Sequence, residues 1–125
     1  MRPDLGVVTW FARTALSALY LSAVTVGELR YGIARVPDHG RRRFLDTWLA
    51  ADLLEEFEGR ILAVDTDVAD RWGKLRAQAT VLGKTLPVID GLIAATALHH
   101  NLAIVTRNRG DLEQSGVTVV DPWTG

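Results

Sequence analysis

Cysteine is absent from the 125 residues of this chain. Its absence excludes disulfide bonds, thiolate metal sites and a cysteine nucleophile together. Histidine is scarce as well: His39 stands alone, and His99 and His100 are adjacent, so none has the spacing of metal ligands. The adjacent pair ends an apolar segment, where cations suit the dipole of a helix. A chain without cysteine is compatible with the cytoplasm, which is the compartment we expect.

Long hydrophobic runs are also missing. The longest candidate, residues 16–26, is interrupted by Ser17, Ser22 and Thr25, and a membrane span needs about 20 apolar residues. Asp4 and Arg13 lie where a secretory signal would need an apolar centre. A net charge of −1 and a pI near 6.3 exclude a generally basic nucleic-acid coat protein. The length predicts a single domain over residues 1–125.

Short apolar segments alternate with helical patterns. The segments with the character of buried strands are LYLSAV (19–24), RILAVD (60–65), LAIVTR (102–107) and VTVVDP (117–122). Helical spacing of apolar residues follows at 26–33, 44–54, 68–82 and 86–100, with a shorter helix expected at 7–11. Such alternation predicts an α/β fold with a parallel sheet covered on both faces. Functional groups of these folds gather beyond the carboxyl ends of the strands.

Asp90 is the one carboxylate in the apolar stretch LPVIDGLIAATALHH. It could be the N-cap of a buried helix, which stabilises a helix by about 1 kcal/mol. It could equally be a metal ligand, because Gly91 at the first helical position would open space beside it. The positive end of a helix would favour a negative charge at this position.

Glu28 follows the first apolar segment in the sequence TVGELRYG. One interpretation is a capping box, in which Glu28 reaches back to the amide of Thr25. The other is an acidic ligand on the first turn of a helix leaving the strand. Gly27 costs helix stability of about 1 kcal/mol relative to alanine, which suggests close packing or a ligand nearby.

Asn108 and Asp111 follow the third apolar segment, in TRNRGDLEQSG. Each alone is typical of a tight turn. Together with Glu28 and Asp90, they place oxygen ligands from three separate segments where this architecture collects its site. Mg²⁺ and Mn²⁺ prefer such ligands. The chemistry that this pattern favours is metal-assisted hydrolysis of phosphodiesters.

Basic residues fit a phosphate-containing substrate. Arg107 adjoins Asn108 and is the preferred phosphate contact, while Arg71 and Lys74 share a helix face with Gln78. The run Arg41 to Arg43 is interpreted as solvated surface.

Three stretches carry a family resemblance: LYLSAVTVGELRYGIARVP, PVIDGLIAATALHHNLAIVTRN and VTVVDPW. They resemble the PIN-domain family over essentially the whole chain, and more narrowly its VapC- and FitB-like toxins. The resemblance implies a three-layer α/β domain with a central parallel sheet flanked by helices. It implies an endoribonuclease that depends on Mg²⁺ or Mn²⁺ and is usually dimeric. A cognate antitoxin, bound over the acidic groove, would form a hetero-oligomer with it.

The resemblance also implies site residues. Glu28 matches the acid after the second strand, Asp90 the acid that opens the apolar helix, and Asn108 the last acidic position. Asp111 is the second choice for that last position. The implied metal ligands are therefore Asp90, Glu28, Asn108 and Asp111.

Two departures from the family pattern follow. The family begins with a strand ending in Asp-Thr-Asn or similar, and nothing here matches that strand or its aspartate, so we expect an N-terminally truncated domain. Loss of this central strand would leave backbone groups of the neighbouring strands unpaired in a buried sheet. Each such group lowers the stability of the fold by about 1 to 3 kcal/mol. Asn108 places a neutral oxygen where an acid is common. The sequence therefore also allows an impaired module that binds the antitoxin without cleaving RNA.

A phospho-acceptor domain is a third interpretation, because its parallel sheet also gathers carboxylates. Asp65 is the one candidate acceptor at a strand end, and no lysine follows at a strand end to support it.

Overall fold

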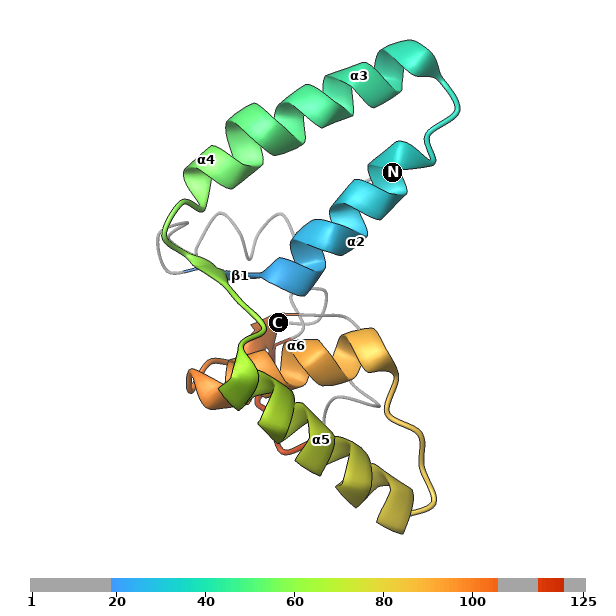
Figure 1. Cartoon of the computed structure of the whole chain (residues 1–125). Coiled ribbons are helices and arrows are strands. Elements are labelled where there is room, and N and C mark those ends of the chain that lie inside the picture. Colours follow the sequence, from blue (N-terminus) through green and yellow to red (C-terminus); the bar gives the residue numbers. More distant parts are fainter. Residues whose placement is uncertain (1–18, 106–114, 121–125) are drawn as a thin grey trace. The chain divides into compact units, whose positions relative to one another are not determined.

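The computed structural model describes residues 19–105 and 115–120 (Figure 1). The predicted helix at residues 7–11 lies outside this part of the chain. The chain divides into two compact units, one formed by Tyr20–Ala63 and the other by Met1–Leu19 together with Val64–Gly125. We call them the helical-hairpin unit and the α5–α6 unit, after the elements that dominate each.

The helical-hairpin unit begins and ends with a short strand. Strands β1 (Leu21–Ser22) and β2 (Ile61–Leu62) pair in parallel, with Leu21 opposite Ile61 and Ser22 opposite Leu62. Between them lie the helices α2 (Ala23–Ala34), α3 (His39–Thr47), η2 (Trp48–Leu53) and α4 (Leu54–Glu56). The last three run on as one rod in Figure 1. The predicted strands at 19–24 and 60–65 are thus present but shorter than predicted.

The rod contains a π-helical segment that the 3.6-residue periodicity did not predict. The amide of Leu54 bonds to the carbonyl of Leu49, five residues before it, which is the π-helical pattern. Leu49 is fully buried, and Ile33 and Phe57 are the other buried hydrophobic residues described in this unit. The rod ends before Gly59, whose φ of 80° places it in the left-handed region that glycine commonly adopts just after a helix.

The α5–α6 unit holds the larger core. Helix α5 (Thr66–Val81) packs against α6 (Val88–His99), and strands β3 (Ile104–Val105) and β4 (Val119–Val120) pair in parallel. The core is drawn from both helices, the connections and the strands. Its buried members are Val68, Leu75, Leu86, Ala94, Ala95, Ala97, Ile104 and Val117.

These elements confirm an α/β fold with parallel strand pairing and with helices at the predicted places. The apolar segment 86–100 forms a largely buried helix, as predicted. Every strand in the described residues has two residues, so the backbone pairs over shorter stretches than the apolar runs indicated. Across 19–105 and 115–120, no helix has the length and apolar character needed to span a membrane.

Candidate metal centre

Asp90 lies in the first turn of α6, but it is not the residue that caps the helix. The cap position belongs to Pro87, whose side chain makes no capping hydrogen bond, and α6 starts at Val88. The predicted N-cap role of Asp90 is therefore wrong. Pro87, three residues earlier, already has the extended backbone of the residue that precedes a helix. As the third helical residue, the half-buried Asp90 carboxylate still lies within the positive end of the helix.

Gly91 does not open space beside Asp90, in contrast to the prediction. It is the fourth residue of α6 and is buried against α5. A Cβ added there would lie 3.0 Å from Leu86 Cδ2, Trp72 Cδ1 and Trp72 Nε1. The missing side chain thus lets the indole of Trp72 pack directly on the backbone that carries Asp90. Close helix packing accounts for this glycine and fixes the first turn of α6.

Glu28 lies in α2 and is exposed. The predicted capping box with Thr25 is wrong, because α2 begins three residues earlier than that motif requires. Its cap is Ser22, whose Oγ accepts a hydrogen bond of 3.1 Å from the amide of Val24. Glu28 is consequently in the second turn and has no capping function. Among the residues that the structure describes, nothing lies within 4 Å of a Cβ added at Gly27, so close packing by those residues does not account for that glycine.

The remaining predicted ligands, Asn108 and Asp111, lie outside the described residues, as does Arg107. Glu28 belongs to the helical-hairpin unit and Asp90 to the α5–α6 unit, so each is placed within its own unit. Of the predicted phosphate contacts on α5, Lys74 forms an ion pair of 3.2 Å with Asp70. Arg71 is exposed on the same helix.

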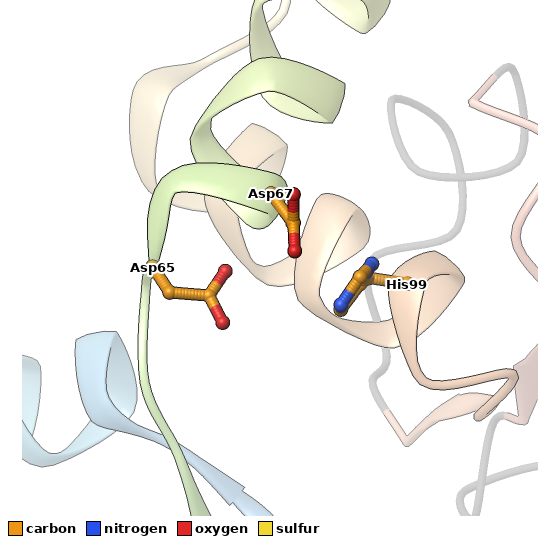
Figure 2. A group of neighbouring side chains, drawn as sticks. All are labelled: Asp65, Asp67 and His99. Carbon is orange, nitrogen blue, oxygen red and sulfur yellow. The ribbon is translucent and has the colours of Figure 1, made fainter.

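A group of potential ligands that the sequence did not indicate is formed by Asp65, Asp67 and His99. One ligand atom of each lies within 4.8 Å of the others. In Figure 2 the Asp67 carboxylate and the His99 ring point toward one another, from the start of α5 and the end of α6. Packing of the two helices brings these distant positions together. His99 was expected only to complement the helix dipole, and its proximity to Asp65 and Asp67 was not predicted.

Asp65 already has a structural task in this group. Its Oδ1 accepts a hydrogen bond of 2.9 Å from the amide of Val68, which makes Asp65 the N-cap of α5. Asp67 is an exposed acid in the first turn of the same helix, where a negative charge is favourable without any cation. The group therefore has a local explanation that needs no metal.

Comparison with known proteins gives the chain a family. The PIN domain model matches residues 6–115. The VapC ribonuclease Y4jK of Sinorhizobium fredii is 38% identical, over 97% of this chain and 86% of the relative. Toxin FitB of Neisseria gonorrhoeae is also 38% identical, over 98% of this chain and 88% of the relative.

The solved structures agree with this similarity. The crystal structure of FitAcB from Neisseria gonorrhoeae contains a chain that superimposes with a TM-score of 0.94. That chain is 38% identical, and the match covers 98% of this chain and 88% of the other. Both the family model and the relatives thus extend over nearly the whole sequence. The chain belongs to the PIN-domain family, and within it to the VapC- and FitB-like toxin ribonucleases.

Proposed function

We propose that the chain is the toxin of a toxin–antitoxin pair and hydrolyses RNA phosphodiester bonds as a metal-dependent endoribonuclease. The observation that carries this proposal is its 38% identity to a VapC ribonuclease over nearly all of its length. The acids that match the family pattern, Glu28 and Asp90, support it from the sequence. Asn108, with Asp111 as the second choice, completes the proposed site.

The proposed ligands suit a hard divalent cation. Glu28 and Asp90 offer carboxylate oxygens, and Asn108 offers an amide oxygen, with neither thiolate nor imidazole among them. Mg²⁺ and Mn²⁺ prefer this donor set. When bound, such an ion supplies positive charge and Lewis acidity toward a phosphate group.

The residues around the proposed ligands have positioning roles. Trp72 and Leu86 pack closely against Gly91, the residue that follows Asp90 in α6. Glu28 is carried by α2, a helix of 12 residues that is capped by Ser22. Rigid helices hold ligands more precisely than loops do. Asp90 and Glu28 would therefore hold the ion, and Arg107 would contact the substrate phosphate.

A cognate antitoxin and a second copy of the chain are the proposed protein partners. Homologues are solved as two-component complexes, including FitAB bound to a DNA fragment and VapBC from Salmonella typhimurium bound to DNA. By analogy, we propose a homodimer that an antitoxin joins in a hetero-oligomer and neutralises by covering the acidic site.

Removal of divalent metal tests the enzyme proposal. Incubation of a labelled RNA pool with the chain should yield cleavage products in Mg²⁺ or Mn²⁺ and none in excess EDTA. Activity should return when Mn²⁺ is added beyond the chelator, because the ligands themselves are unchanged. Gel electrophoresis of the RNA measures both steps. Cleavage that persists at full rate in EDTA would contradict the metal-dependent mechanism.

Asn108 favours a second candidate function, a module that binds antitoxin without cleaving RNA. A neutral amide in place of an acid weakens a cation site. Expression of the Asp90→Asn variant separates the two functions. Loss of growth inhibition with antitoxin binding retained supports the ribonuclease, whereas a growth phenotype that does not change supports the binding module.

A further inference from the structure

An exposed aromatic ring and an arginine are stacked on α2. Tyr31 is 60% exposed. The guanidinium carbon of Arg35 lies over its ring, 5.2 Å from the ring centroid. Arg35 is the C-cap residue of α2, so the pair lies at the end of the helix. A cation above the ring face is electrostatically favourable, and it orders both side chains at the surface.

The same helix face carries Glu28. Residues three and seven positions apart lie on one face of an α-helix, and Glu28, Tyr31 and Arg35 have this spacing. A rise of about 1.5 Å per residue places Tyr31 roughly one turn beyond Glu28. The ring and the guanidinium are therefore next along the helix from a proposed catalytic carboxylate.

The surroundings of the pair are basic. The corner between α2 and α3, residues 35–43, contains four arginines and one aspartate. Arg42 has structural partners there, since it bonds to the carbonyl of Val36 and lies 2.8 Å from Nδ1 of His39. Arg41 and Arg43 are exposed. Such a surface attracts a polyanion and repels a basic peptide.

We propose that Tyr31 and Arg35 form a stacking platform for single-stranded RNA beside the cleavage site. An unpaired base would stack on the Tyr31 ring in place of the Arg35 guanidinium, which would move aside to contact the adjoining phosphate. Aromatic rings paired with arginine bind single strands in this way with little sequence preference. The platform rests on the proposed ribonuclease function, to which it would add a preference for unpaired RNA.

Binding of RNA in EDTA tests the platform without requiring cleavage. The probe is a fluorescein-labelled single-stranded RNA of mixed sequence, with a duplex of the same sequence as comparator. Tyr31→Ala should weaken binding of the single strand by about 10-fold, with little effect on the duplex. Tyr31→Phe should bind within about twofold of the unchanged chain, because stacking needs the ring and not the hydroxyl. Fluorescence anisotropy measures each affinity.

Two further variants separate stacking from general surface effects. Phe44 is 71% exposed on α3, and Phe44→Ala removes a ring at least as accessible as that of Tyr31 from another helix of the same unit. It should leave RNA affinity unchanged. Arg35→Ala should weaken binding and lower the salt-dependence slope by about one, the expected effect of losing one phosphate contact.

Photocrosslinking locates the contact directly. RNA substituted with 5-iodouridine should crosslink to the peptide that contains Tyr31, as mass spectrometry would show. If Tyr31→Ala binds RNA as tightly as the unchanged chain, the platform is overturned. The same holds if that variant keeps its RNA affinity and loses antitoxin binding instead. A chain that binds RNA through Tyr31 but never cleaves it would contradict the ribonuclease proposal and leave the platform standing.

Discussion

Replacing Asp90 by asparagine is expected to reduce RNA cleavage by at least about 100-fold, because groups that only support a metal ligand already contribute 10- to 100-fold. The substitution keeps the size of the side chain and removes its charge. A neutral amide binds a hard cation less tightly than a carboxylate does. Initial rates with labelled RNA at saturating Mn²⁺ measure the loss, and circular dichroism checks that the fold is kept.

Asp67→Asn is the matched control for this prediction. Asp67 is also an acid in the first turn of a helix in the same unit, and it belongs to the group with Asp65 and His99. Because its charge is explained by the helix dipole, its replacement should leave cleavage within about twofold of the unchanged rate, the effect of a few tenths of a kcal/mol. The reverse pattern, with Asp67→Asn inactive and Asp90→Asn active, would place the metal at the wrong end of α6 for this account.

Replacing Trp72 by alanine is expected to lower the free energy of unfolding by about 3 kcal/mol, the lower end of the range for large aromatic residues because Trp72 is partly exposed. The indole packs against the core of the α5–α6 unit and against the backbone of Gly91. Its removal leaves a cavity beneath the turn that carries Asp90. Cleavage measured where the variant is still folded should therefore also fall.

Trp72→Phe distinguishes packing from polar interactions. Within the described residues, the Trp72 Nε1 atom is buried and has no hydrogen-bond partner. A phenylalanine removes this unpaired donor and retains most of the ring, so its cost should be well below that of alanine. Urea denaturation measures both variants. A loss for Trp72→Phe equal to that for Trp72→Ala would contradict the packing explanation.

The sequence predicted helices well and their first residues poorly. Apolar spacing located α2, α5 and α6, because each buries one face or most of its surface. The predicted N-caps were Thr25 and Asp90, whereas the observed ones are Ser22 and Pro87. The sequence could not choose the right residue, because more than one near each helix start is suited to precede a helix. Only the backbone decides among them: Pro87 has the extended ψ of 141° that ends a connection, whereas Asp90 is already helical.

Features that depend on tertiary packing were not predictable from local patterns. The approach of His99 to Asp65 and Asp67 arises from the contact between α5 and α6. The same contact explains Gly91, which looked like open space in the sequence and is a packing surface in the structure. The π-helical turn at Leu49 likewise follows no 3.6-residue pattern.

The proposed site residues have a different origin. Glu28, Asp90 and Asn108 were assigned from their order in a family pattern, and the family itself is confirmed. The structure removes the predicted capping role from both Glu28 and Asp90, and the role of these two carboxylates as metal ligands remains a proposal. Asn108 and Asp111 stay predictions.

In the proposed site, side chains from separate segments of the chain bind one divalent ion. Anomalous diffraction from crystals of the full chain soaked in Mn²⁺ measures this directly. We expect a single strong peak about 2 Å from carboxylate oxygens of both Asp90 and Glu28. A peak between Asp65, Asp67 and His99 instead, or one bound by Asp90 without Glu28, would contradict the account.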